Sequence, residues 1–330
     1  MVGERMRVIG TRCAALAIIW VLYGSAVGAA NDGYPSQPVN IVVPITPGSP
    51  TDSLARIVAD RLSARWQQTV MVLNVTGGGQ NIGAARVAHS PPDGYTLLVS
   101  PPPALTVNHL LYKELNYKPN QFTPITVLAQ VPNVLIVRKD FPASSVQDLI
   151  AYAKENPNNV TFGSQGMGST AHLTASRLAA LTGIKLIHVP YHGELPVLND
   201  IIGGHLDMFF GTLSTAVPLY RAGKVRILAV ADLQRSSAIP DIPTMTEAGL
   251  QGFQSTAWYA LVAPPNTDGS LIARINRDVV AILEEHEVSE KLERLHLKPV
   301  KGSPSETASF IAKESALWSK VLEEANVPMQ

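Results

Sequence analysis

The chain has 330 residues, in which 26 basic residues balance 26 acidic ones and charged residues make up 16%, below the usual share of about 25%. The balanced charge argues against a nucleic-acid-binding protein, and the 46% hydrophobic content argues against a disordered chain. A single cysteine excludes a disulfide scaffold and a cysteine-based metal cluster. The length suggests about two domains of ~150 residues each.

The first thirty residues have the order of a secretory signal peptide. Three arginines up to Arg12 precede an apolar run at 13–23, and small residues then lead to a predicted cleavage site after Ala29 or Ala30. The apolar run is shorter than the ~20 residues that span a bilayer. Without residues 1–30, the chain keeps 23 basic and 25 acidic residues, a net charge of −2, and no cysteine.

Short apolar strands and amphipathic helices alternate along the exported chain. The sequence predicts, in order, a strand at 39–44, a helix at 52–66, a strand at 69–75, a helix at 81–89, strands at 95–100 and 134–138, a helix at 146–156, a strand at 160–163, a helix at 170–181, a strand at 185–189, a helix at 195–202, a strand at 206–210, a helix at 215–222 and a strand at 225–231. This alternation with short turns indicates parallel α/β layers.

The C-terminal part follows a different pattern. One more strand at 258–264 precedes helices at 270–286, 288–296 and 304–325, with no strands between them. These helices must cover a sheet formed earlier in the chain. We therefore predict two lobes with a ligand cleft between them: residues 31–131 and 255–330 form the first lobe, and residues 132–254 form the second.

Four of the predicted strands end in loops rich in Gly, Ser and Thr, at 44–52, 74–81, 163–170 and 210–215, and each loop precedes a helix. Glycine lets the backbone approach a ligand, and a helix start leaves N–H donors unpaired, so such a loop favours an anion without any basic side chain. One such loop alone is more often an ordinary turn, capped here by Thr51, Asn81 or Thr170. Four of them favour a shared anion pocket at the carboxyl ends of the strands.

A dinucleotide site is the main alternative, and it would make the protein a nucleotide-dependent oxidoreductase. Gly77, Gly79 and Gly83 follow a strand and open a helix, close to a variant of the dinucleotide-binding fingerprint. That fingerprint needs an acidic residue at the end of the next strand, where this chain has Ser100 followed by three prolines. The sequence therefore argues against this alternative.

Catalytic and metal-binding signals are weak. Ser164 does not lie in a nucleophile elbow, and His188 and His192 have no acidic partner to complete a zinc set. Asp52 precedes Arg56 by four residues, which favours support of the helix over acid catalysis. His172 lies in the first turn after a Gly-rich loop, where it either donates to a ligand carboxylate or caps and packs. We expect no enzyme activity, no metal and no cofactor.

In these motifs the chain resembles the Bug-type, TctC-like solute-binding receptors of tripartite tricarboxylate transporters, over essentially all of its exported part. The matching stretches are YPSQPVNIVVP, PGSPTDSLAR, TGGGQNIGA, PPDGYTLLV, VPNVLIV, FGSQGMGSTAHL, HVPYHG, IIGGHLDMFF, IPDIPTMTEAGLQGF and the terminal helix with Trp318. The resemblance implies a type II periplasmic-binding-protein-like α/β fold, each lobe a mainly parallel sheet flanked by helices, with the ligand between the lobes.

The resemblance also implies which residues hold the ligand carboxylate, largely through backbone N–H groups and ordered water. From the first lobe these are Thr46, Gly48, Ser49, Thr51, Gly79 and Asn81, and from the second Ser164, Gly166, Thr170, His172, Gly211 and Thr212. The chain departs from the family pattern at Ser49, Val75, Gly211 and Ser214. The resemblance therefore leaves open whether the ligand is a di- or tricarboxylate, an amino acid or an aromatic acid.

The function implied is that of a monomeric periplasmic receptor. It would capture a small organic anion and present it to the membrane components of a tripartite tricarboxylate transporter, with no nucleic acid as a partner. A sensor that reports the same ligand to a signalling partner is the alternative within this class.

Overall fold

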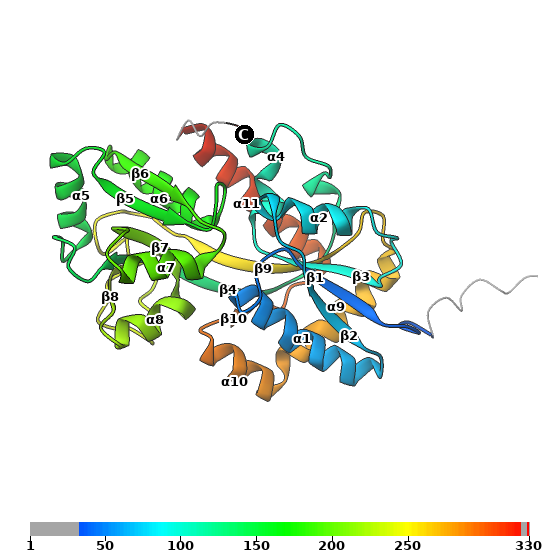
Figure 1. Ribbon diagram of the computed structural model, residues 1–330. Coiled ribbons are helices and arrows are strands. Elements are labelled where there is room, and N and C mark those ends of the chain that lie inside the picture. The colour runs from blue at the N-terminus through cyan, green and yellow to red at the C-terminus, as the bar shows by residue number, and fades with distance from the viewer. Residues whose placement is uncertain (1–32, 325–328, 330) are drawn as a thin grey trace, which may run out of the picture.

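A computed structural model describes residues 33–324 and residue 329, so the predicted signal peptide, with Cys13, lies outside the described residues. The described chain forms two α/β lobes that share one long strand, β4 (Thr123–Arg138) (Figure 1). Lobe 1 contains β1 (Val39–Val43), α1 (Pro50–Trp66), β2 (Val70–Asn74), η1 (Gly78–Gln80), α2 (Asn81–Ala88), β3 (Thr96–Ser100), α3 (Pro103–Thr106), α4 (Asn108–Leu111), η2 (Pro119–Gln121), β9 (Thr256–Ala263), α9 (Gly269–Glu284), α10 (His286–Arg294), β10 (Lys298–Pro299) and α11 (Pro304–Glu324). Lobe 2 contains α5 (Val146–Glu155), β5 (Val160–Ser164), α6 (Thr170–Thr182), β6 (Leu186–Pro190), α7 (Glu194–Ile202), β7 (Met208–Thr212), α8 (Leu213–Arg221) and β8 (Val225–Val230).

The two sheets meet in β4. The hydrogen-bonded strand order is β2-β1-β3-β9-β4 in lobe 1 and β4-β7-β5-β6 in lobe 2, with β10 and β8 also pairing with β4. The outer strands β1, β2 and β3 are parallel, as are β5, β6 and β7, whereas β4 and β9 pair antiparallel with their neighbours. The α/β fold class is confirmed. The sheets are mixed rather than mainly parallel, because the chain enters lobe 2 along β4 and returns beside it along β9.

Amphipathic helices cover these sheets. Helix α1 buries Leu54, Val58 and Leu62, spaced at one turn, and these side chains form the stripe that the sequence predicts. Helix α9 buries a similar stripe that includes Ile275 and Val279. Trp258 of β9 is fully buried and donates its indole N–H to Glu314 of α11, 2.9 Å away. In the part of the chain that the structure describes, no helix is long and apolar enough to cross a membrane.

Several features differ from the sequence prediction. A short strand, β10, lies between α10 and α11, where the sequence predicts helices without strands between them, and it pairs with β4. The short helices α3 and α4 are not predicted either. Strand β4 starts at Thr123, whereas the sequence predicts a strand only from 134, because Pro124 and Pro132 interrupt its apolar run. Bulges near Pro124 accommodate the first proline in the ladder to β9. The helix caps also differ. Ser49 caps α1 and Ser169 caps α6, while α2 begins without a side-chain cap, so Thr51, Thr170 and Asn81 are not the caps.

The chain crosses between the lobes at two adjacent points. Pro132 of β4 pairs with Thr256 of β9, and the next residue, Asn133, pairs with Thr212 of β7 in lobe 2. The side chain of Asn133, 2% exposed, donates to Ser255 Oγ at 2.7 Å. Ser255 also bonds to Thr174 of α6, so a buried polar cluster joins both crossings to lobe 2.

An apolar cluster forms a second contact between the lobes. Leu173 of α6 packs with Val107 and Leu111 of lobe 1 and with Trp318 and Val321 of α11. Helix α11, drawn in red, reaches from the body of lobe 1 to this contact (Figure 1). The lobes therefore touch beside the crossings as well as through them.

We expect Asn133→Ala to lower the free energy of unfolding by about 1–3 kcal/mol, because it removes a buried donor from the Ser255 cluster. Asn159→Ala, at an exposed turn of lobe 2, is the matched control and should change stability by less than about 0.5 kcal/mol. Urea unfolding followed by circular dichroism measures both. Equal stability of the two variants would contradict a structural role for the cluster.

Candidate ligand-binding site

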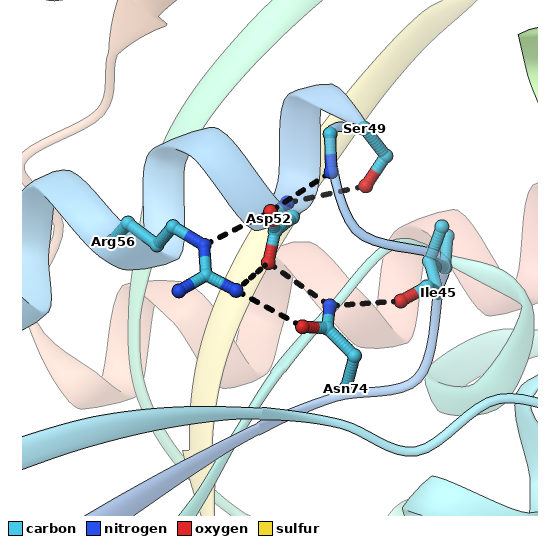
Figure 2. A network of polar contacts seen from close by, with 6 residues as sticks. Ile45, Ser49, Asp52, Arg56 and Asn74 are labelled. Carbon is cyan, nitrogen blue, oxygen red and sulfur yellow. Dashed lines mark hydrogen bonds and ion pairs between the residues drawn. The ribbon is translucent and has the colours of Figure 1, made fainter.

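The first loop, between β1 and α1, is held by a buried carboxylate. Asp52 is 3% exposed and accepts the Gly48 N–H at 2.9 Å, while its own N–H donates to Ser49 Oγ at 3.2 Å. Arg56 pairs with Asp52 from the next turn, with Nη2 3.0 Å from Oδ1 (Figure 2). The predicted support of the helix by Asp52 and Arg56 is confirmed, and Asp52 in addition fixes the turn at Gly48.

The same carboxylate ties the first loop to the second. Asn74, the last residue of β2, donates from Nδ2 to Asp52 Oδ1 at 2.9 Å and to the Ile45 carbonyl at 3.0 Å (Figure 2). Arg56 Nη2 donates to Asn74 Oδ1 at 3.1 Å and closes the ring. Burial alone raises the pKa of Asp52, but hydrogen bonds from Arg56, Gly48 and Asn74 outweigh it and hold the pKa below its ordinary value.

Asp52→Asn should lower the free energy of unfolding at pH 7 by about 1–3 kcal/mol, because Arg56 and the Gly48 N–H lose a charged acceptor. The folded-state pKa of Asp52 is lowered, so its contribution is present at neutral pH and disappears as the pH falls through that pKa. The difference between the wild type and the variant should therefore shrink below about pH 4. Asp60→Asn, exposed on the same helix, is the control in a pH series of thermal unfolding; an equal effect of both variants would refute the role of Asp52.

The second loop contains three glycines with positive φ angles, Gly77, Gly78 and Gly79. A Cβ atom on Gly79 would lie 2.1 Å from the Tyr112 hydroxyl, so only glycine fits there. Asn108 of α4 donates to the Gly79 carbonyl at 2.9 Å and also to Asn81 Oδ1. The amide oxygen of Asn81 is therefore engaged within lobe 1.

The glycine spacing of the second loop has a packing explanation. A Cβ atom on Gly83 would lie 2.6 Å from the Val75 carbonyl and 2.9 Å from Pro44 Cβ. Gly83 therefore lets α2 pack closely against the ends of β1 and β2. No nucleotide is needed to explain the pattern Gly77-x-Gly79-x-x-x-Gly83.

Two histidines pack beneath the third loop, between β5 and α6. Ser164 Oγ lies 2.7 Å from His188 Nε2 and accepts the Gly166 N–H at 3.1 Å. The ring of His172 lies 4.4 Å from that of His188, and His172 Nδ1 accepts the Gly168 N–H at 3.3 Å. Burial lowers the pKa of His172 to about 3, with a smaller effect of His188, and burial lowers the pKa of His188 to about 4.

Both rings are therefore neutral at physiological pH. The sequence analysis gave two possible roles for His172. In the structure it packs and accepts a loop N–H, while its donation to a ligand carboxylate stays a prediction. Among the described residues, no group of three or more His, Cys, Asp or Glu side chains could hold a metal ion.

The predicted fourth loop is a direct junction in the structure, because β7 runs to Thr212 and α8 begins at Leu213. This junction, still called the fourth loop below, surrounds a carboxylate that the sequence analysis did not single out. Glu194, the first residue of α7, accepts the Thr212 N–H at 2.9 Å and the Thr215 hydroxyl at 2.6 Å, both on Oε1. Gln165 of the third loop adds a side-chain hydrogen bond. Burial raises the pKa of Glu194 above its ordinary value, although these hydrogen bonds oppose the shift. The signal in the sequence was an acid at a helix start directly after Gly193.

Glu194→Gln should stabilise the folded protein at pH 8 and have little effect at pH 4. The pKa of Glu194 is raised in the folded protein. At a pH above the ordinary pKa of glutamate, the folded protein therefore binds more protons than the unfolded chain, and the stability of the wild type falls as the pH rises. Glutamine keeps the shape and has no charge to bury. The melting-temperature difference between variant and wild type should grow from pH 4 to pH 8, whereas exposed Glu293→Gln shows no such trend. A constant difference would contradict the burial of this charge.

The two lobes present these loops toward each other. A Cβ atom on Gly193 in lobe 2 would lie 3.5 Å from Thr46 Oγ1 in lobe 1. A Cβ atom on Gly168 would lie 2.2 Å from Leu111 of lobe 1. The first and second loops lie side by side because β1 and β2 are neighbours, and the third and fourth do so because β5 and β7 are neighbours. All four loops thus lie at the facing edges of the lobes.

The predicted site residues differ in exposure. Thr46, Gly48 and Gly79 are exposed; Ser49, Asn81, Gly166 and Thr170 are half-buried; Thr51, Ser164, His172, Gly211 and Thr212 are buried. Gly211 is closely packed: a Cβ atom there would lie 2.7 Å from Ile136 Cδ1 and from Phe209, so the structure explains this glycine by packing. A hollow of about 780 Å³, lined by none of the predicted site residues, lies between α4, η2 and α11, with Lys113 and Lys118 in its lining.

The sequence of residues 54–327 matches the profile of the tripartite tricarboxylate transporter family receptor. The chain belongs to this family. The protein BugT of Bordetella pertussis is 33% identical over 319 residues, which cover 96% of this chain and 98% of BugT. The resemblance stated from the sequence motifs is confirmed.

Solved structures give the same result for the fold. Rpa4515 of R. palustris, solved with adipate, has 36% sequence identity and a TM-score of 0.85, and the match covers 90% of this chain and all of that one. MatC from Rhodopseudomonas palustris, solved with bound malate, has 31% identity and a TM-score of 0.82, covering 88% of this chain and all of the other. The family is one of solute-binding receptors, and the present structure shares its two-lobed α/β architecture.

Proposed function

We propose that this receptor is exported to the periplasm, binds a small organic anion between its lobes and presents it to the membrane components of a tripartite tricarboxylate transporter. The observation that carries the proposal is the placement of four Gly-, Ser- and Thr-rich loops, two from each lobe, at facing edges. The adipate and malate in the similar structures support a carboxylate as the ligand class.

Backbone groups supply most of the binding energy in this proposal. A partly buried helix N-terminus contributes up to ~2 kcal/mol to anion binding, and each hydrogen bond to a charged group about 1.5–3 kcal/mol. Several such contacts, less the cost of ordering, reach the ~8 kcal/mol of micromolar affinity. The contacts we propose come from Thr46, Gly48, Ser49, Thr51, Gly79 and Asn81 of lobe 1 and from Ser164, Gly166, Thr170, His172, Gly211 and Thr212 of lobe 2. No catalytic residue is required.

The lobes would close about the two crossings. We propose residues 31–131 with 255–330 and residues 132–254 as the units that move, and the Asn133–Ser255 cluster as the pivot. The signal peptide would be removed after Ala29 or Ala30, and the receptor would act as a monomer without a cofactor.

Gly48→Glu tests the pocket. The backbone at Gly48 has φ +80° and no atom within 4 Å of a built Cβ, so the new carboxylate would project from the exposed loop and repel a ligand anion. Adipate and malate are the probes in isothermal titration calorimetry, because related receptors were solved with them. We expect the variant to lose at least tenfold in affinity for whichever probe the wild type binds.

Gly183→Glu is the matched control for backbone strain. Gly183 ends α6 with φ +72° and likewise has no atom near its built Cβ, so its substitution strains the backbone without placing charge on the loops. Gly79→Glu is less suited to the test, because Tyr112 fills the space. An equal loss of affinity in both variants, or no loss in Gly48→Glu, would refute the placement of the pocket.

A further inference from the structure

Glu194 lies where lobe 2 faces lobe 1. It follows Gly193, whose built Cβ would lie 3.5 Å from Thr46 Oγ1 in the first loop. Burial raises the pKa of Tyr259 of β9, in lobe 1, and the charge of Glu194 adds a smaller effect in the same direction. The residue as a whole is half-buried, whereas its carboxylate is enclosed by Thr212, Thr215 and Gln165. A ligand between the lobes would therefore lie close to this carboxylate.

The internal partners of Glu194 leave one of its oxygens with room for another donor. The short contacts from Thr212 N–H and the Thr215 hydroxyl both end on Oε1. Thr212 Oγ1 approaches Oε2 only to 3.4 Å. The single hydroxyl proton of Thr212 lies closer to Oε1, which is 3.2 Å from Oγ1. Because a carboxylate oxygen accepts about two hydrogen bonds, Oε2 can accept a further one.

Further acceptors on the facing loops lack partners. Gln165 Oε1 in lobe 2 and Gln80 Oε1 and Asn108 Oδ1 in lobe 1 are buried without a hydrogen bond. The orientation of Asn108 is set by its amide nitrogen, which donates to the Gly79 carbonyl. Its Oδ1 lies 3.6 Å from a Cβ built on Gly168 and so faces lobe 2. Buried acceptors are stabilised by a donor, which a ligand can supply.

We propose that Glu194 is a specificity-determining residue: it selects organic acids that carry a hydrogen-bond donor, an ammonium or a hydroxyl group, over unsubstituted acids of the same length. This inference rests on the proposed function and names its ligand class. Lobe 1 supplies N–H donors for the carboxylate of the ligand, and Glu194 with the unpartnered amide oxygens supplies acceptors for its donor group. A buried carboxylate also disfavours an additional negative charge beside it.

Two matched series of probes test this inference by calorimetric titration. Each series contains an unsubstituted acid, its hydroxy acid and its amino acid: succinate, malate and aspartate in the first, and glutarate, 2-hydroxyglutarate and glutamate in the second. We expect the wild type to bind a donor-bearing acid at least tenfold more tightly than the unsubstituted acid of its series. Glu194→Gln should reduce that ratio to about threefold or less, since a charge-assisted hydrogen bond is about twice as strong as a neutral one. A larger loss for the amino acid than for the hydroxy acid identifies an ammonium ligand, and equal losses identify a hydroxyl ligand.

Glu155→Gln, the same substitution at the exposed end of α5 in lobe 2, is the control and should leave the ratio unchanged. Three results would overturn the inference while the proposed function stands. The wild type could bind the unsubstituted acid as tightly as the others, Glu194→Gln could leave the ratio unchanged, or Glu155→Gln could change the ratio equally. Failure of the wild type to bind any of the six acids would contradict the proposed function itself, and the inference with it.

Discussion

One strand in two sheets is the constraint on which this architecture depends. The first part of β4 pairs with β9 in lobe 1, and from Asn133 onward it pairs with β7 and β8 in lobe 2. Because the return strand β9 starts beside Pro132, both crossings lie within a few residues of each other. At this junction of the lobes Asn133 and Ser255 form a buried hydrogen bond. Together with the apolar contact around Leu173, this region sets the position of one lobe relative to the other.

The loops of the two lobes each contain a buried carboxylate, but the charges around the two carboxylates differ. In lobe 1, Asp52 is surrounded by Arg56, Asn74 and the Gly48 N–H, so its charge is balanced and its pKa lies below the ordinary value. In lobe 2, Glu194 has only neutral donors around it, and burial raises its pKa. The first carboxylate therefore shapes a loop, whereas the second remains an acceptor that a ligand can use. His172 and His188 add no charge, since burial keeps both neutral.

Residues that the motifs single out serve different purposes in the folded chain. Gly79 and Gly83 are required by close contacts with Tyr112 and Val75, and Gly211 packs toward Ile136 and Phe209. Thr51 and Thr170 lie inside the first turns of α1 and α6 rather than at the caps, which Ser49 and Ser169 provide. Periodicity locates such helices well, but it does not resolve which of several adjacent hydroxyl groups caps them, because each can accept a backbone N–H at that spacing.

The sequence by itself determined the alternation of strands and helices, the Gly-rich loops at the ends of the strands and the family, because these depend on local periodicity and on motifs in a set order. Only the tertiary structure decided that β4 begins at Thr123, since pairing with β9 on one side and β10 on the other holds a proline-interrupted segment extended. It also brought Glu194, Gln165 and Thr212 together from three separate segments. No local pattern encodes that cluster, because its members are neighbours only through the parallel pairing of β5, β6 and β7. The low charged fraction of the chain fits this result: the facing loops are built mainly from backbone groups, hydroxyls and amides, with few charges among them.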